Sequence, residues 1–333
     1  MFTRLSVAVA TLLLAVPMLA MASQTMKAIQ RTGYGGPDVL LLADVAKPSA
    51  GTGQVLIRVH AAGVNPVDWK MREGGLRGMI SEAPAVLGFD VAGTVEAVGD
   101  GVTTFKAGDE VFAYIALDRG GGYAEFAAVP AAHVAKKPAA VDFVTAAAVP
   151  LAALTAWQAL VDKAGMKEGQ TVLVHAGAGG VGHFAIQIAK ARGAKVIATA
   201  SKANHNFLKS LGADVVVDYK NEKFEDVAKD VDIVLDSIGG DTQERSLGVL
   251  KQGGALISIV QPPDPAKLKE RSLRGEVMLV APNGAQLAEL AALIDAGKIK
   301  PHVSETFPLA EAAKAQEQSK AGHVRGKIVL KVR

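Results

Sequence analysis

Residues 171–182 read TVLVHAGAGGVG, an apolar run that leads directly into a glycine-rich turn. The run predicts a buried strand, and the periodicity of Val181–Arg192 predicts a helix that Gly193 ends. G-x-G-x-x-G between a strand and a helix indicates a dinucleotide-binding turn, because glycine lets the backbone approach a pyrophosphate and the helix start offers free N–H groups. An ordinary strand–helix turn is the alternative. The expected cofactor contacts are Gly177, Gly179, Gly180, Val181 and Gly182.

Apolar runs of strand length recur through this part of the chain, with helix-like segments between them. The six runs are Thr171–His175, Lys195–Ala200, Asp214–Tyr219, Val231–Ser237, Ala255–Val260 and Glu276–Val280. Their nearly continuous valine and isoleucine is expected for strands that helices cover on both faces. The pattern therefore predicts an α/β fold with a doubly wound parallel sheet.

The residues before Pro150 show a different pattern. Val55–Val59, Val91–Val98 and Glu110–Tyr114 are short apolar runs separated by Gly, Pro and Asp. Such spacing predicts a compact barrel-like or sandwich β domain. Ala146–Ala159 then reads as an alanine-rich helical crossing.

The C-terminal residues indicate how the domains are connected. A helix is expected at Ala285–Ala296, and a short strand-like run follows at Lys327–Val332. That last run has no room in a finished six-stranded sheet, so we expect the tail to return to the first domain. The predicted parts are residues 26–149, 150–282 and 283–333.

The end of the second strand predicts which dinucleotide is bound. An NAD site usually has Asp or Glu there, which accepts hydrogen bonds from the ribose 2′-OH. This chain has no acidic residue from His183 to Ala213, and the strand ends in Ser201 and Lys202. A hydroxyl and an ammonium attract a 2′-phosphate. We therefore expect NADP(H), with Ser201 and Lys202 as phosphate contacts; a solvated surface charge is the alternative for Lys202.

The composition excludes several classes of protein. The 333 residues carry a net charge of +3 with no long basic run, so nucleic-acid binding has no electrostatic support. Cysteine is absent, which excludes disulfides, thiolate nucleophiles and cysteine-ligated metal sites. Half of the residues are hydrophobic, enough for a sizeable core.

The N-terminus has the pattern of an export signal. Arg4 precedes an apolar run, Leu5–Ala20, and Ala20-Met21-Ala22 has the A-x-A form of a cleavage site. Residues 1–22 are thus expected to be a signal peptide, with Ser23 first in a periplasmic or secreted protein. The alternative is a cytoplasmic protein that starts at Met26. Export conflicts with the scarcity of reduced nucleotide outside the cytoplasm.

Several separated motifs resemble those of one enzyme superfamily. Residues 88–99 read GFDVAGTVEAVG and residues 108–111 read GDEV, which resembles the signature of the medium-chain dehydrogenases/reductases. Residues 65–70 (NPVDWK), 236–240 (DSIGG) and 326–330 (GKIVL) are similar to its zinc-free quinone oxidoreductase branch, the relatives of zeta-crystallin. The resemblance runs from Met26 to Arg333.

This resemblance implies a GroES-like β-barrel catalytic domain completed by the C-terminal tail, an inserted Rossmann domain, an active site in the cleft between them, and a homodimer. Alcohol dehydrogenases of the superfamily bind zinc through cysteine and a Gly-His-Glu motif. Here Asn65 and Phe89 stand near those ligand positions, and no metal is expected because phenylalanine cannot ligate one. The implied cofactor or active-site contacts are Asn65, Thr155, Tyr219, Ser237, Ile238 and Ile259.

These features predict NADPH-dependent hydride transfer to a quinone or an α,β-unsaturated carbonyl without zinc. The developing oxyanion then needs hydrogen-bond donors, for which Asn65 and Tyr123 are the candidates. Asn65 has an alternative role as the turn residue before Pro66, and Tyr123, after three glycines, as a loop residue without chemistry. The alternative functions are reduction of simple aldehydes or alcohols, and an NADPH-binding structural or sensor module without turnover.

Overall fold

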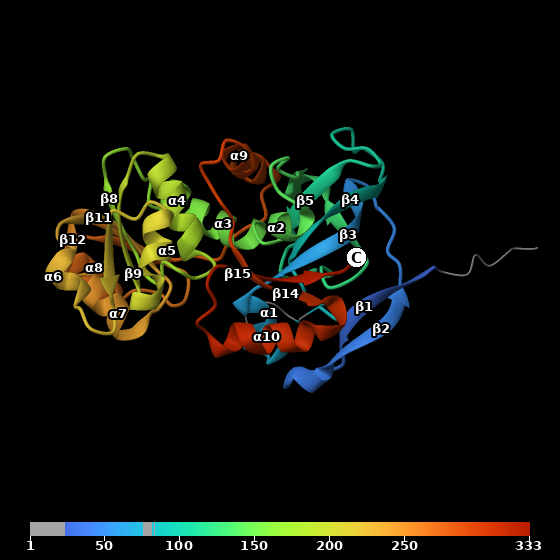
Figure 1. The fold of residues 1–333 in the computed structure, drawn as a ribbon, viewed down its shortest axis with the longest axis horizontal. Coiled ribbons are helices and arrows are strands. Elements are labelled where there is room, and N and C mark those ends of the chain that lie inside the picture. Colours follow the sequence, from blue (N-terminus) through green and yellow to red (C-terminus); the bar gives the residue numbers. More distant parts are fainter. Residues whose placement is uncertain (1–23, 76–81, 83) are drawn as a thin grey trace, which may run out of the picture.

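The computed structural model describes residues 24–75, 82 and 84–333, which form two lobes connected through a helical crossing (Figure 1). The predicted signal peptide, residues 1–22, lies outside the described residues. Among the described residues, no helix combines the length and the apolar character needed to cross a bilayer.

One lobe is a six-stranded, fully parallel sheet in the order β10-β9-β8-β11-β12-β13. The strands are β8 (Thr171–Val174), β9 (Lys195–Ala200), β10 (Val215–Asp218), β11 (Val231–Asp236), β12 (Leu250–Ser258) and β13 (Arg274–Val277). The helices between them are α4 (Gly182–Ala191), α5 (His205–Ser210), α6 (Phe224–Val227), α7 (Gly240–Ser246) and α8 (Pro265–Glu270). The doubly wound α/β prediction is confirmed. The strand order reverses between β8 and β11, where such sheets bind ligands.

The other lobe is a mostly antiparallel sheet in the order β14-β15-β3-β4-β5-β7, with β6 paired to β3. Its strands from the first part of the chain are β3 (Gln54–Val64), β4 (Asp90–Val98), β5 (Glu110–Tyr114), β6 (Phe126–Pro130) and β7 (Val134–Lys136). A separate hairpin, β1 (Thr25–Arg31) with β2 (Leu40–Ala46), and the helix α1 (Pro66–Arg72) complete it. The predicted GroES-like domain is therefore present.

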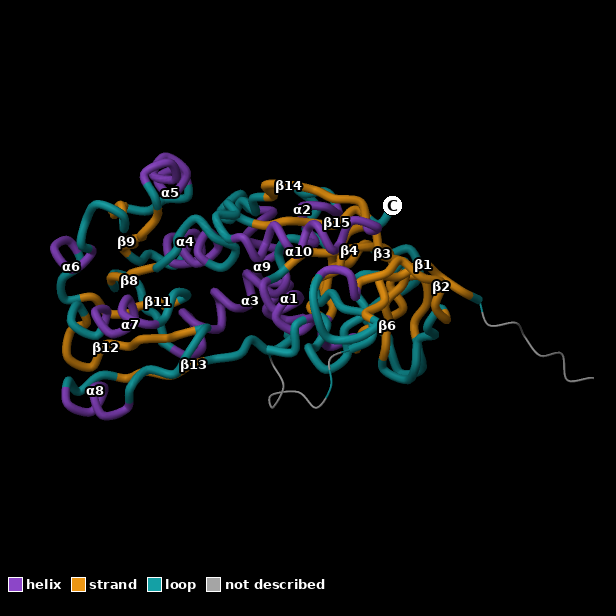
Figure 2. The backbone as a smooth tube through the Cα atoms, turned by 90° about the horizontal axis from the view of Figure 1, so that it is seen from below, coloured by secondary structure: helices purple, strands orange, loops and turns teal. Residues whose placement is uncertain are grey.

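The C-terminal return completes this second lobe. Strand β15 (Lys327–Lys331) pairs antiparallel with β3, and β14 (Val303–Pro308) pairs parallel with β15. Helix α10 (Ala312–Ala321) packs on α1, and α9 (Gly284–Asp295) packs on β7. The last residues thus lie beside strands from the start of the chain (Figures 1 and 2).

The predicted helical crossing Ala146–Ala159 is not one helix. It consists of α2 (Phe143–Ala147), α3 (Pro150–Trp157) and a π-helical turn, Gln158–Lys163. Pro150 has no N–H to continue α2, but a proline suits the first turn of a new helix. The backbone N–H of Leu151 is thereby left at the start of α3, where it donates to Asp90 Oδ1 at 2.7 Å.

Gly182 makes the closest contact between the glycine-rich turn and the helix that follows it. A Cβ at this position would lie 2.3 Å from the Ala176 carbonyl oxygen and 2.7 Å from Gly177 Cα. We expect Gly182→Ala to lower the free energy of unfolding by about 1–3 kcal/mol through overpacking, measured by urea denaturation. Gly33→Ala, where a Cβ would meet nothing within 4 Å, is the matched control. An equal free energy of unfolding for Gly182→Ala and Gly33→Ala would contradict the close packing described for Gly182.

Candidate cofactor and active site

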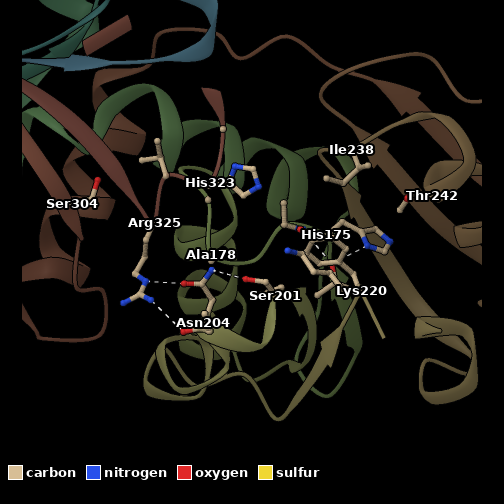
Figure 3. A pocket seen from close by; sticks show the side chains of 18 of the residues that line it. His175, Ala178, Ser201, Asn204, Lys220, Ile238, Thr242, Ser304, His323 and Arg325 are labelled. Carbon is tan, nitrogen blue, oxygen red and sulfur yellow. Dashed lines mark hydrogen bonds between the residues drawn. The ribbon is translucent and has the colours of Figure 1, made fainter. Parts of the chain in front are cut away.

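A cavity of about 1520 Å³ opens at the carboxyl ends of the central parallel strands. His175 and Gly179 line it after β8, Ser201 after β9, Tyr219 after β10 and Ile238 after β11. Figure 3 shows His175, Ser201 and Ile238 around it. The cavity therefore lies at the switch point of the sheet, where a doubly wound fold binds its nucleotide.

The opposite wall of the cavity comes from the C-terminal return. Residues 302–305 and 321–325 line it, and the guanidinium of Arg325 points toward Asn204 on the sheet side (Figure 3). Arg325 Nε donates to Asn204 Oδ1 at 2.8 Å, and Asn204 Nδ2 donates to Ser201 Oγ at 3.3 Å. Residues of both lobes thus meet at the end of β9.

The backbone of the glycine-rich turn is arranged to bind an anion. The carbonyl of Ala178 accepts from Gly326 N–H at 2.8 Å, and that of Gly179 accepts from His183 Nδ1 at 2.9 Å. These bonds fix the directions of both carbonyls. The N–H groups of Gly180 and Val181 have no acceptor among the described residues. Free, oriented N–H groups before a helix fit a pyrophosphate.

His175 fixes the start of this turn through one chain of hydrogen bonds. Ser246 Oγ donates to the Thr242 carbonyl at 2.6 Å, so it accepts from His175 Nε2 at 2.9 Å. His175 Nδ1 then accepts from Thr199 Oγ1 at 3.2 Å, and that oxygen accepts from Ala176 N–H at 3.2 Å. The chain holds Ala176 at its positive φ of 49°. It also requires a neutral imidazole, and burial lowers the pKa of His175 to about 4.

Asp236 shapes the loop that carries Ile238. This fully buried carboxylate accepts from the N–H groups of Ile238 and Gly239 at 2.9 and 2.8 Å, and from the Gln243 and Ser258 side chains, both at 2.9 Å. Ile238 is consequently held 53% exposed at the cavity. An apolar side chain fixed there can pack against a flat ring.

The predicted cofactor residues divide into two groups. Gly179, Ser201, Tyr219 and Ile238 line the cavity. Those that do not line it are Thr155, Gly177, Gly180, Val181, Gly182, Lys202, Ser237 and Ile259. Thr155 Oγ1 donates to the Leu151 carbonyl, Ser237 Oγ donates to the His175 carbonyl, and Lys202 is exposed to solvent. The individual roles stay predictions.

The two predicted oxyanion donors lie in a buried junction outside the cavity. Asn65 is 1% exposed and its Nδ2 donates to Asp90 Oδ2 at 2.8 Å. Tyr123 is fully buried rather than in an open loop, and its hydroxyl faces the side chains of Asp68 and Gln316. Burial, followed by the charge of Asp68, raises the pKa of Tyr123 well above its ordinary value. Their catalytic roles stay predictions.

Sequence reasoning did not identify four residues that the fold brings to these sites. Asn204, Lys220 and Arg325 line the cavity, and Lys327 lies in the buried junction with Asn65. The only signal was the Gly326–Leu330 motif, which marked the return strand but not what its neighbours contact. Within residues 24–75, 82 and 84–333, no group of three or more His, Asp or Glu side chains is placed to hold a metal ion.

The neutral state of His175 predicts a pH dependence of stability. Its folded pKa, about 4, lies below the ordinary 6.5, so unfolding takes up a proton between these pH values. The contribution of His175 is therefore complete above pH 6.5 and is lost as the pH falls toward 4. We expect the advantage of wild type over His175→Gln to shrink by at most about 1.4 kcal/mol per pH unit, measured by urea denaturation. A difference independent of pH across this range would contradict the assignment.

Family models match both lobes. Residues 51–139 match the alcohol dehydrogenase GroES-like domain, and residues 211–330 match a model described as zinc-binding dehydrogenase. The tomato (Solanum lycopersicum) 2-methylene-furan-3-one reductase is 40% identical over 316 residues, covering 92% of this chain and 79% of the relative. The Arabidopsis thaliana chloroplastic NADPH-dependent alkenal/one oxidoreductase is 39% identical over 316 residues, with the same 92% and 79% coverage.

A solved structure has the same arrangement. The quinone oxidoreductase from Coxiella burnetii superposes with a TM-score of 0.85 at 39% identity, covering 93% of this chain and all of that one. The identity, the coverage and the shared two-lobed fold lead to one conclusion. The chain belongs to the medium-chain dehydrogenase/reductase superfamily, in the branch of the quinone and alkenal/one oxidoreductases.

Proposed function

We propose that this protein is an NADPH-dependent oxidoreductase that transfers hydride to a quinone or an α,β-unsaturated carbonyl without zinc. The observation that carries the proposal is the cavity at the switch point, which the glycine-rich turn lines through Ala178 and Gly179; next in the chain, the N–H groups of Gly180 and Val181 have no acceptor among the described residues. The names of the similar proteins support this substrate class and NADPH. When bound, the nicotinamide would supply the hydride.

The polar residues at the end of β9 support NADPH over NADH. Ser201, Asn204 and Arg325 form a connected polar surface there, and Lys220 lines the same cavity. Arg325 has no carboxylate partner within the described part of the chain. Two carboxylates also line the cavity, but Glu222 accepts from Asp218 N–H and Glu305 from Gln318. A guanidinium without an acidic partner suits a 2′-phosphate.

Substrate activation without zinc is proposed because the side chains near the expected metal position cannot form its site. The chain has no cysteine, and Phe89 is fully buried in the hydrophobic core. A hydrogen-bond donor must then stabilise the negative charge that develops on the substrate oxygen. Asn65 is the residue that we propose for this role.

The function is tested by mixing purified protein with NADPH and panels of quinones, enones and saturated aldehydes. We expect oxidation of NADPH with quinones or enones, little with saturated aldehydes, and unchanged rates after dialysis against a chelator. The absorbance of the reduced nicotinamide gives the rate. Turnover confined to aldehydes would favour the simple carbonyl reductase, and NADPH binding with no turnover would favour a binding module. Loss of activity with zinc removal would refute the zinc-free mechanism.

Arg325 provides a test of cofactor choice. A hydrogen bond to a charged group contributes about 1.5–3 kcal/mol, so we expect Arg325→Gln to raise the KM for NADPH by about 10–100-fold and to leave that for NADH unchanged. Steady-state kinetics with both nucleotides measure this. Lys209→Gln, an exposed change on α5 away from the cavity, is the control.

The contribution of Lys202 is measured separately with Lys202→Gln. A selective rise in the KM for NADPH would support the phosphate contact predicted from the sequence, and an unchanged value would assign Lys202 to the solvated surface. If Arg325→Gln raised the KM equally for both nucleotides, the guanidinium would not recognise the 2′-phosphate.

We also propose that residues 1–22 direct export. The pattern of Arg4, the apolar run and the A-x-A site supports this. N-terminal sequencing of protein from periplasmic, secreted and cytosolic fractions tests it. The expected first residue is Ser23 in an exported fraction. A single cytosolic form beginning at Met26 would refute export.

A further inference from the structure

Lys327 is a buried cation at the junction of the two lobes. It is 3% exposed and follows Gly326, whose N–H donates to the Ala178 carbonyl at 2.8 Å. The methylene stem of Lys327 lies against the glycine-rich turn, because a Cβ on Gly180 would be 3.2 Å from Lys327 Cδ. A buried ammonium requires oxygen partners, since desolvating an unpaired charge is very unfavourable. The oxygen atoms around Lys327 Nζ therefore identify the groups that this lysine holds in place.

Those partners all belong to the lobe with the mostly antiparallel sheet, called the catalytic lobe below. Lys327 Nζ donates to the Val64 carbonyl at 2.7 Å and to Asn65 Oδ1, and it lies 3.7 Å from Asp90 Oδ2. Asp90, itself fully buried, accepts from Asn65 Nδ2 at 2.8 Å and from Leu151 N–H at 2.7 Å. One lysine side chain thus connects the nucleotide turn with the candidate catalytic amide.

This arrangement gives the Asn65 amide a single orientation. An ammonium cannot accept a hydrogen bond and a carboxylate cannot donate one. The amide oxygen must therefore face Lys327, and the amide nitrogen must face Asp90. The described residues supply one acceptor to this nitrogen, the Asp90 carboxylate. The second N–H of Asn65 has no partner among them.

We propose that Lys327 is a positioning residue for hydride transfer, which orients and polarises the Asn65 amide so that its second N–H, which lies outside the cavity, can donate to the oxygen of a substrate that enters the junction between the lobes. The inference rests on the function proposed above. Donation by the ammonium to the amide oxygen withdraws electron density from the amide nitrogen and strengthens it as a donor. In an enone, the β-carbon accepts the hydride, the carbonyl oxygen takes the resulting negative charge, and water supplies the proton that completes reduction.

A double-mutant cycle on enone reduction at saturating NADPH tests this assignment. Wild type, Lys327→Met, Asn65→Ala and the double variant are compared for kcat and for the KM for NADPH. We expect Lys327→Met to lower kcat by about 10²-fold, the effect of misplacing a reacting group by about 1 Å, with a small change in KM. In the Asn65→Ala background the same change should have no further effect on kcat.

Lys331→Met is the matched control, because it removes an exposed lysine from the same strand; it should leave kcat unchanged. If Lys327→Met fails to fold, Lys327→Met with Asp90→Asn, which removes both buried charges, takes its place in the cycle. If Lys327→Met lowered kcat by the same factor in the wild-type and the Asn65→Ala backgrounds, the positioning role of Lys327 would be refuted. An unchanged kcat in folded Lys327→Met would also refute it, and in both cases the proposed function would stand. Absence of wild-type turnover with every acceptor would overturn the proposed function and this inference together.

Discussion

The hydrogen bond from Gly326 N–H to the Ala178 carbonyl connects the last strand of the chain to the nucleotide turn. Its geometry depends on a glycine, because Gly326 has a φ of +68° and a Cβ there would lie 2.3 Å from the His302 carbonyl oxygen. The donor of this bond comes from the catalytic lobe, and it fixes the direction of the Ala178 carbonyl in the glycine-rich turn. The N–H groups of the glycine-rich turn therefore keep this orientation only when the C-terminal return is in place.

A second set of bonds from the return holds the same turn. His183 donates from Nδ1 to the Gly179 carbonyl and accepts at Nε2 from His302 N–H at 3.4 Å. Gln187, one turn further along α4, exchanges hydrogen bonds with both backbone groups of Lys300. The turn is thus fastened to the C-terminal segment at Ala178, and the helix that follows it at two further residues, His183 and Gln187. Folding of the nucleotide domain and closure of the catalytic sheet are consequently coupled.

The sequence predicted the sheet well because its strands are covered on both faces. Lys195–Ala200 was predicted at the bounds that the structure has, and the run after Gly326, for which a return to the first domain was expected, forms β15 and pairs with β3. The break between α2 and α3 has a local signal, Pro150, which lacks the N–H that would continue α2, but the apolar pattern continues across it and predicts one helix. Local pattern could not place Arg325, whose cavity contact depends on how two distant segments meet. The absence of an acid after β9 predicted phosphate contacts at Ser201 and Lys202; Ser201 lines the cavity with Asn204 and Lys220, whereas Lys202 is exposed to solvent outside it, and the phosphate site stays a prediction.

The buried groups at the junction oppose the histidines in their effect on stability. Burial raises the pKa of Asp68 to about 7 from 3.8, so its contribution to stability is complete below pH 3.8 and is lost as the pH rises toward 7. His175 and His183, with pKa values lowered to about 4 by burial, lose their contributions in the opposite direction between 6.5 and 4. Unfolding at pH 5 therefore takes up protons at two histidines and releases one at Asp68. Burial also raises the pKa of Asp90 and lowers that of Lys327, but each attracts the other's charge across 3.7 Å. The fold thus combines buried groups whose proton balances on unfolding oppose one another, which reduces the change in the free energy of unfolding with pH.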